Sequence, residues 1–385
     1  MRKLVYIGYQ PLTHKVMDDF FMSDFMRDGY TVQYWDLSKI YFPKITFLNT
    51  IDENWIIKIT KISQLEQLLK LNKKEEYFYF INFPYGWLVL DVFKLLTKYD
   101  AKIGIVARGM IPLPSLTHNL SLKTFLSKLK FEKFVRLVQN KIALLLKKKG
   151  LIKPFDLVFY TGDESLGILG IGFQIDIKTA NLIPINSSDY EIYLKAKLTV
   201  SESVDKYVVF LDEYLPFHPD WKMLKIEPLE AGKYYQSLNN FFLEIEKKYG
   251  LKVIIAAHPK ADLYKTQNFF NGREVYFGKT VELVRDSEFV IAHMSTSVGF
   301  AVTFEKKIVF VYTDDHYKSM WPQFNIVLYF SKIFNTQLIN IDSLSIIEID
   351  NEIDKERYND FIYSYMTSKE TRNTDSYSII KKSFN

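Results

Sequence analysis

The sequence predicts an α/β fold made of two units, each built around a parallel β-sheet, with the two sheets facing a central cleft. The chain has 385 residues, which is long for one domain and comfortable for two. Short runs that are typical of strands alternate along it with helical patterns, as in proteins that layer helices on a parallel sheet. Two such series meet near residue 200, which implies a cleft between two units.

The first half of the chain contains five runs that are typical of strands. They are Leu4–Gly8, Thr31–Asp36, Tyr77–Phe83, Lys102–Arg108 and Leu157–Gly162. Between some of them the patterns predict helices at Val16–Arg27 and Trp87–Tyr99. Because ligands of open parallel sheets bind at the carboxyl ends of strands, the loops that follow these runs are candidate site positions.

The second half repeats the pattern. Strands are predicted at Tyr207–Leu211, Lys252–Ala257, Phe289–Ala292 and Lys307–Tyr312, and helices at Tyr234–Tyr249, Val281–Arg285 and Ser295–Phe304. In the longest of these helices, apolar residues recur at spacings of three or four, and Gly250 follows as a stop signal.

These patterns divide the chain into three parts. Residues 1–196 form a predicted N-terminal domain, and residues 197–325 form a predicted C-terminal domain. Residues 326–385 are expected to be helical and to pack back across the domains. Ile185–Ser203 is a plausible linker, and the polar tail from Thr367 is expected to be loosely ordered.

Composition excludes several classes of protein. There are no cysteines, so disulfides, thiolate metal sites and a cysteine nucleophile are excluded. A net charge of +5 does not indicate nucleic-acid binding. No signal peptide or membrane-spanning run is found, which predicts a cytoplasmic protein. Phosphate loops, dinucleotide fingerprints, zinc-protease motifs, nucleophile elbows and Asp-x-Asp pairs are also missing.

A first candidate motif lies at the end of the strand predicted at Lys252–Ala257. His258 follows this strand, and Pro259 restricts its backbone to an extended conformation. The imidazole of His258, held there, can donate a hydrogen bond to a phosphate or to the oxygen of a leaving group. Lys260 adds a positive charge nearby. The alternative is a turn histidine that binds nothing.

A second candidate motif is Ser295, Thr296 and Ser297, which follow another predicted strand and open a predicted helix. Backbone N–H groups at a helix start bind phosphate, and hydroxyl side chains add donors. The alternative is simple helix capping, which needs only one such residue. His293 is a candidate either for this site or for a satisfied position in the core.

A carboxylate pair, Asp212 and Glu213, follows the first strand of the second half. One of them is a candidate general base on an acceptor hydroxyl, or a ribose ligand. Neighbouring side chains on a strand point to opposite sides, so at most one is expected to face the cleft. The alternatives are a solvated loop acid here and a base in the first half, at His14, Asp163 or Glu164.

The segment Lys123–Lys149 interleaves lysines with leucines and other apolar residues. It fits an amphipathic helix that rests on an anionic membrane surface, which would place the protein on the inner face of the membrane. The alternative is a helix packed on the core with a solvated lysine face.

The ordered series of acidic pair, His258-Pro259 and Ser295-Thr296-Ser297 resembles the motifs of bacterial sialyltransferases and polysialyltransferases. Kdo transferases of capsule and lipopolysaccharide synthesis are similar, and teichoic-acid polymerases share a related pair of motifs. The resemblance covers mainly residues 205–312. It implies the GT-B fold, with two Rossmann-like domains, and a cytidine-nucleotide donor. Residues 1–196 would then be the acceptor-side domain, and residues 197–325 the domain that binds the nucleotide sugar.

By this resemblance, His258 contacts the donor phosphate, Pro259 shapes the turn, and the three hydroxyl residues bind the phosphate. Asp212 or Glu213 is the implied base, although Tyr214 stands where the family usually has glycine, which leaves the base open. The implied reaction is an inverting transfer of a nonulosonic acid or Kdo from a CMP-linked donor to a glycan or glycolipid acceptor, without a metal or other cofactor.

Two alternatives remain at this point. One keeps the fold and changes the chemistry, to a UDP-sugar transferase or a sugar epimerase. The other is a membrane-surface assembly protein without catalytic activity. Nucleic acid is not an expected partner.

Overall fold

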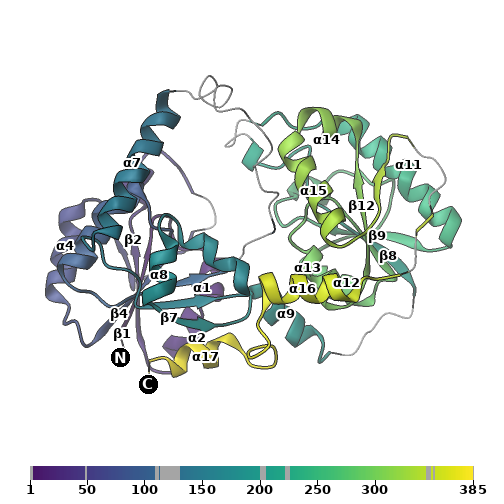
Figure 1. The fold of residues 1–385 in the computed structure, drawn as a ribbon. Helices are drawn as coiled ribbons and strands as arrows, with labels where there is room; N and C mark the ends of the chain where they lie inside the picture. The colour runs from purple at the N-terminus through teal and green to yellow at the C-terminus, as the bar shows by residue number, and fades with distance from the viewer. Residues whose placement is uncertain are drawn as a thin grey trace. The chain divides into compact units, whose positions relative to one another are not determined.

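The computed structural model describes residues 3–384 apart from 48–49, 109–111, 113–130, 200–204, 222–225, 344–347 and 350–351. The chain divides into two compact units (Figure 1). Unit 1 comprises Met1–Met110, Thr117–Ser188 and Thr367–Asn385, and unit 2 comprises Ile111–Leu116 and Asp189–Met366. Each unit holds its own parallel sheet, so the predicted α/β class is confirmed.

The sheet of unit 1 has seven strands in the order β3-β2-β1-β4-β5-β6-β7. Its strands are β1 (Lys3–Gly8), β2 (Thr31–Asp36), β3 (Ile56–Lys58), β4 (Tyr77–Ile81), β5 (Ile103–Ala107), β6 (Leu157–Tyr160) and β7 (Asn181–Pro184). The strand order reverses between β1 and β4, which makes their carboxyl ends the topological switch point where such sheets bind ligands.

Helices cover this sheet. They are α1 (His14–Asp19), α2 (Met22–Arg27), α3 (Ser38–Tyr41), α4 (Ile62–Leu71), α5 (Leu90–Lys98), α7 (Phe131–Lys148), α8 (Phe173–Thr179) and α17 (Ser376–Lys382), with 3-10 turns η1 (Trp87–Val89) and η2 (Asp163–Leu169). The single helix predicted over Val16–Arg27 is wrong. The backbone carbonyl of Phe20 accepts a hydrogen bond from the Tyr6 hydroxyl (3.1 Å), and Phe21 has φ 54°, so the chain breaks into α1 and α2.

The C-terminal tail is ordered and belongs to unit 1, contrary to the expectation of a loose end. Ile380 and Phe384 are buried in the same cluster as Leu4 and Phe78. The hydroxyl of Thr367 donates to the amide oxygen of Asn186 (2.6 Å), and the amide nitrogen of Asn186 donates to the backbone carbonyl of Thr374 (2.8 Å), so Asn186 holds the first part of this segment. Apolar residues at the very end of the chain therefore complete the core of unit 1.

One lysine of the basic segment is not on a solvated face. Lys147, in the last turn of α7, is buried and forms an ion pair with the buried Asp176 of α8 (2.5 Å). Its ammonium lies 4.6 Å from the centre of the Tyr85 ring. Lys123, Lys128 and Lys130 of this segment lie outside the described residues. In the part of the chain that the structure describes, no helix combines the length and apolar character needed to cross a membrane.

The sheet of unit 2 has six strands in the order β10-β9-β8-β11-β12-β13. They are β8 (Tyr207–Leu211), β9 (Lys252–Ala257), β10 (Val275–Phe277), β11 (Phe289–Ala292), β12 (Lys307–Tyr312) and β13 (Leu338–Asn340). Counted within the unit, this is the doubly wound order 3-2-1-4-5-6. Both strand orders confirm the prediction of two Rossmann-like domains, and the switch point of unit 2 lies between β8 and β11.

The helical elements of unit 2 are α9 (Ser188–Ala196), α11 (Ala231–Tyr249), η3 (Asp262–Lys265), α12 (Thr280–Asp286), α13 (Val298–Thr303), α14 (Asp314–Ser319), α15 (Trp321–Ile333), α16 (Lys355–Phe361) and η4 (Ile362–Met366). The segment expected as a linker therefore contains α9, whose Tyr190 and Ala196 are buried in the core of unit 2. Residues 200–203 of that segment lie outside the described residues.

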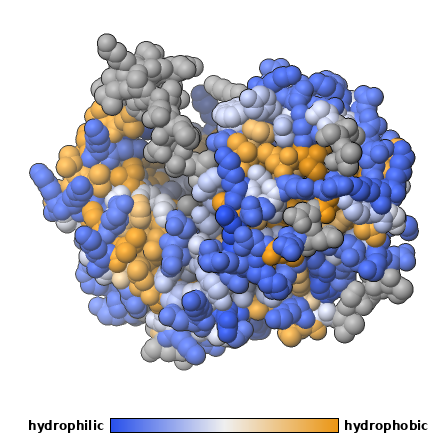
Figure 2. All heavy atoms as spheres, turned by 45° about the vertical axis from the view of Figure 1, so that its right-hand side comes forward, coloured by the Kyte–Doolittle hydropathy of each residue, from blue (hydrophilic) through white to orange (hydrophobic). Residues whose placement is uncertain are grey.

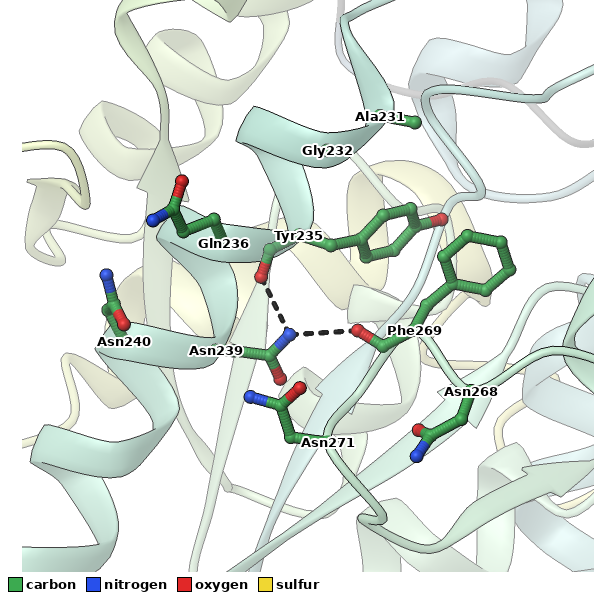
Figure 3. Close-up of a pocket in the computed structure, with 9 residues that line it drawn as sticks. All are labelled: Ala231, Gly232, Tyr235, Gln236, Asn239, Asn240, Asn268, Phe269 and Asn271. Carbon is green, nitrogen blue, oxygen red and sulfur yellow. Dashed lines mark hydrogen bonds between the residues drawn. The ribbon is translucent and has the colours of Figure 1, made fainter.

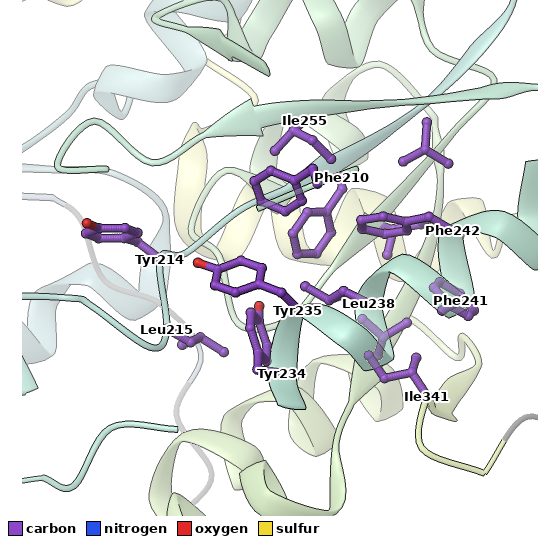
Figure 4. Packing of buried hydrophobic residues seen from close by; sticks show 14 of the residues in the cluster. Phe210, Tyr214, Leu215, Tyr234, Tyr235, Leu238, Phe241, Phe242, Ile255 and Ile341 are labelled. Atoms are coloured by element: carbon purple, nitrogen blue, oxygen red, sulfur yellow. The ribbon is translucent and has the colours of Figure 1, made fainter. Parts of the chain in front are cut away.

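The longest helix, α11, packs its apolar face on β8 and β9. Tyr235, Leu238 and Phe242 of the helix lie in one cluster with Phe210 and Ile255 of the strands (Figure 4). The helix begins where the Glu230 side chain accepts from two free backbone N–H groups, and it ends at Gly250 with φ 65°, as predicted. This packing fixes the ends of β8 and β9 relative to the start of α11.

Candidate functional site

Three of the predicted motifs meet at one edge of the sheet of unit 2. Leu211 of β8 lies level with Ala256 of β9 and with Ala292 of β11. Beyond the ends of these strands, the backbone N–H of His258 bonds to the side chain of Asp212, and that of Met294 bonds to the side chain of Glu213. Neighbouring strands are about 4.8 Å apart, so β9 and β11 are separated by roughly 10 Å across β8. The His-Pro and hydroxyl motifs therefore flank the acidic pair at the switch point.

Asp212 ties the end of β8 to the loop after β9. Its carboxylate accepts a hydrogen bond from the backbone N–H of His258 (3.3 Å) and another from the Tyr264 hydroxyl (3.1 Å). The residue is 4% exposed. Burial raises the pKa of Asp212 to about 6, although these hydrogen bonds oppose the rise. The side chain thus fixes the position of His258.

Glu213 makes the corresponding contact on the other side. Its carboxylate accepts from the backbone N–H of Met294 (3.0 Å), directly before the hydroxyl motif. Burial, and to a smaller degree the neighbouring charge of Asp212, raises the pKa of Glu213 to about 8. Asp212 thus contacts the loop after β9, and Glu213 contacts the loop after β11. Both are buried, which favours a positioning role over that of a base on an exposed acceptor.

His258 is half-buried, and its ring packs edge to face against the ring of His218 with centres 4.8 Å apart. In each ring Nδ1 accepts from a backbone N–H two residues on, from Lys260 (3.1 Å) and from Asp220 (3.2 Å). Each neutral ring therefore carries its proton on Nε2. Burial, then the charges of His218 and Lys260, lower the pKa of His258 to about 4, so its ring is a neutral donor at physiological pH.

Lys260 forms an ion pair with Asp220 (2.9 Å), and both side chains are partly exposed. The pair joins the loop after β8 to the loop after β9, as the edge-to-face contact of the two histidine rings also does. Sequence reasoning assigned no role to His218 or Asp220. The available signal was that His218 ends the same loop that begins with the acidic pair.

The hydroxyl motif lies before its helix rather than inside it. The helix predicted from Ser295 begins at Val298, because the backbone N–H groups of residues 298–300 bond to carbonyls three residues back. The N–H of Ser297 bonds to the Ser295 hydroxyl (3.2 Å). These four N–H groups are occupied. Within the described residues, the side-chain hydroxyls of Thr296 and Ser297 make no hydrogen bond, so they remain the donors that this motif offers.

His293 is a satisfied core residue and not a site residue. It is fully buried, with Nδ1 at 2.6 Å from the backbone carbonyl of Val311 and Nε2 at 3.0 Å from the Tyr234 hydroxyl. A carbonyl can only accept, so Nδ1 carries the proton and Nε2 accepts from the tyrosine. Burial lowers the pKa of His293 to about 4.

The candidates in unit 1 lie at two different places on its sheet. His14 is exposed at the start of α1, which follows the loop after β1. Asp163 and Glu164 are exposed at the start of η2, after β6. Two strands, β4 and β5, lie between β1 and β6 in the sheet. Among the residues described here, no group of three or more acidic or histidine side chains is arranged to hold a metal ion.

We expect Glu213→Gln to flatten the dependence of stability on pH. Unfolding frees the carboxyl to lose its proton near its ordinary pKa of 4.5, whereas the folded protein keeps it up to about pH 8. The free energy of unfolding should therefore fall as pH rises through this window, by up to about 1.4 kcal/mol per pH unit from this group. Glutamine keeps an acceptor for Met294 without titrating. Urea denaturation at pH 5, 6.5 and 8 measures the effect, and parallel profiles for the two proteins would refute it.

No protein-family model and no curated protein sequence matches this chain. Solved structures of similar arrangement include the calicheamicin glycosyltransferase CalG4, with TM-score 0.49 and 11% identity, covering 100% of this chain and 98% of that one. An H548A variant of the wall teichoic acid polymerase TagF has TM-score 0.48 and 13% identity, covering 100% and 89%. The UDP-GlcNAc 2-epimerase of Methanocaldococcus jannaschii has TM-score 0.45 and 10% identity, covering 99% of each chain.

Proposed function

We propose that unit 2 binds the nucleotide of a sugar nucleotide at the ends of β9, β8 and β11, and that the protein is an inverting GT-B glycosyltransferase. One observation carries the proposal. The carboxylates of Asp212 and Glu213 hold the His258 loop and the Met294 loop on either side of the switch point. Such a point is where doubly wound sheets bind nucleotides.

The donors at this edge suit a phosphate that leaves with negative charge. His258 offers Nε2–H from a neutral ring, and Thr296 and Ser297 offer hydroxyls. Fixed donors aimed at developing charge lower the barrier of a transfer without reorganising during the reaction. His218 offers a second Nε2–H beside the first, so we assign it to the same phosphate.

The base is a separate question. By the motif resemblance it is Asp212 or Glu213, but the burial of both favours a role in holding the loops. Among the remaining candidates, we favour His14, because it is exposed and follows the loop after β1, one of the two strands at the switch point of unit 1. Asp163 and Glu164 follow β6, farther along that sheet.

For the donor we propose a CMP-linked acidic sugar, such as a nonulosonic acid or Kdo, used without a metal in the synthesis of a surface polysaccharide. A nucleoside monophosphate leaves with less negative charge than a diphosphate. Neutral hydrogen-bond donors can therefore stabilise it without a metal ion. The competing reading is a UDP-sugar transferase or an epimerase.

A thermal-shift panel tests these readings. A ligand at a hundred times its Kd stabilises a protein by about 2.7 kcal/mol, so the nucleotide that binds most tightly raises the melting temperature most. We therefore expect CMP to raise the melting temperature of this protein more than UDP or CDP does at equal concentration. Stabilisation by UDP alone would exclude the CMP-linked donor and favour the competing reading. A panel in which no nucleotide stabilises the protein would contradict the nucleotide site itself.

We also propose that α7 rests on an anionic membrane surface. Val138, Ile142 and Leu145 are exposed at spacings of four and three residues, on one side of the helix, and the exposed Lys141 and Lys148 lie on the same helix. Figure 2 shows apolar residues at the surface in several places, among them the left of the view. We expect co-sedimentation with phosphatidylglycerol vesicles that an Ile142→Ser/Leu145→Ser variant loses. Equal recovery of both proteins would count against this contact.

A further inference from the structure

Unit 2 has a pocket of about 340 Å³ that belongs to none of the motifs above. It lies between the first turns of α11 and the loop that follows η3 (Figure 3). Its volume is at the lower end of the range of about 300–1,000 Å³ that is usual for small-ligand sites. Tyr235 and Asn239 line it from the helix, and Asn268, Phe269 and Asn271 line it from the loop.

The two walls of this pocket are fastened together. The amide nitrogen of Asn239 donates to the backbone carbonyl of Tyr235 on the helix and to that of Phe269 on the loop, both at 2.8 Å. The amide oxygen accepts from Arg273 (2.9 Å), whose guanidinium is also held by Glu246 (2.7 Å). The pocket therefore keeps its shape without a ligand, and such preorganisation reduces the entropy lost on binding.

Several side-chain amides at the mouth of the pocket are not fully hydrogen-bonded within the described residues. Gln236, Asn240 and Asn271 are exposed, and within the described residues their amides make no hydrogen bonds. The oxygen of Asn268 accepts from the backbone N–H groups of residues 270 and 272, while its nitrogen has no partner in the same part of the chain. Each free amide offers donors and acceptors side by side.

The lining also excludes some ligands. None of the residues that line the pocket carries a charge at neutral pH. The guanidinium of Arg273, behind Asn239, is already paired with Glu246, so the lining itself offers an anion or a nucleotide phosphate no cation. Phe269 is the aromatic member of the loop wall, and its ring packs against those of Tyr235, Phe217 and Tyr264 with centres 4.7, 5.4 and 5.6 Å apart. Neutral amides around an aromatic ring suit a ligand with adjacent hydroxyls and a C–H face.

We propose that this pocket binds an uncharged sugar unit of a glycan. Vicinal hydroxyls pair with the amides, and the C–H face of the sugar lies against Phe269. The site is separate from the nucleotide site proposed above, and it would retain a growing or acceptor chain on unit 2. A glycan chain held in this pocket would have a higher effective concentration at the site of sugar transfer, because it is tethered to the same protein.

The test uses the full-length protein and isothermal titration with neutral tetrasaccharides of glucose, galactose and N-acetylglucosamine, and with a sialic-acid tetrasaccharide as the anionic control. We expect at least one neutral probe to bind and the anionic probe not to bind. A Gln236→Ala/Asn240→Ala variant and an Asn271→Asp variant should each weaken binding about tenfold. Aspartate suits position 271 because its backbone has φ 52°, which asparagine and aspartate tolerate.

Gln267→Ala is the matched control, because Gln267 is exposed in the same loop and does not line the pocket. Tyr235 is left unchanged, since its hydroxyl bonds to that of Tyr264 (2.7 Å), which in turn donates to Asp212. Binding of no neutral probe, or binding that the pocket variants do not weaken, overturns the proposal. The outcome is independent of the nucleotide panel, because the pocket variants should keep their nucleotide response and His258→Ala should keep glycan binding.

Discussion

Lys147→Ala should lower the free energy of unfolding of unit 1 by about 3–5 kcal/mol. The ammonium of Lys147 and the carboxylate of Asp176 are 1% and 0% exposed, so removing the lysine leaves a charge buried without its partner. Burial lowers the pKa of Lys147 and raises that of Asp176, while their attraction opposes both shifts. Asp176 also accepts from the backbone N–H of Phe155 (3.1 Å), so the loss reaches the loop before β6.

Urea denaturation followed by circular dichroism measures this effect. Lys148→Ala is the matched control, because Lys148 is the next residue of α7 and is exposed, and we expect it to change stability by less than about 0.5 kcal/mol. A double variant, Lys147→Met/Asp176→Leu, should recover most of the loss, because no charge then remains buried. Equal stabilities of the two single lysine variants would show that the pair contributes nothing.

His258→Ala should reduce kcat/KM for sugar transfer by about 10²–10³-fold, the usual loss when one preorganised donor to developing charge is removed. Its ring is held by Asp212 through the backbone and by Lys260 through Nδ1, so Nε2–H has a fixed direction. Because the pKa of His258 is about 4, the neutral ring should persist above that pH. The rate should then show no titration from this group between pH 6 and 8.

Release of nucleotide from the donor identified by the thermal-shift panel is the measurement. Lys265→Ala is the control, since Lys265 is exposed in η3 and pairs only with Asp262 among the described residues (2.6 Å). Near-normal turnover by the His258 variant, with its fold intact by circular dichroism, would remove the imidazole from the mechanism. A variant that loses activity together with its folded signal is replaced by His258→Asn, which keeps a side-chain N–H donor and should retain part of the rate.

The central strands of both sheets were predictable from the sequence, whereas the edge strands were not. Strands such as β8 and β11 are buried on both faces, so they appear as continuous apolar runs. The four strands that the pattern missed, β3, β7, β10 and β13, are the outermost strands of the two sheets. Each has only three or four residues and none is fully buried, so their sequences carry little signal.

The motifs of the site were predictable because each follows a recognisable strand. Their connections were not, because a hydrogen bond between Glu213 and the N–H of Met294 joins residues 81 positions apart. The edge-to-face contact of His218 with His258 and the burial of Lys147 likewise depend on where other elements lie. A basic residue in an amphipathic helix gives no local sign of the carboxylate that another helix brings to it.

The sequence by itself determined the α/β class, the buried strands and the places where polar residues leave them, since these depend on local periodicity and on residue types at strand ends. Only the tertiary structure decided which loops are tied together, which charges are buried and where the amide-lined pocket forms. Those properties depend on contacts between residues far apart in the chain, and burial sets the dielectric around each charge.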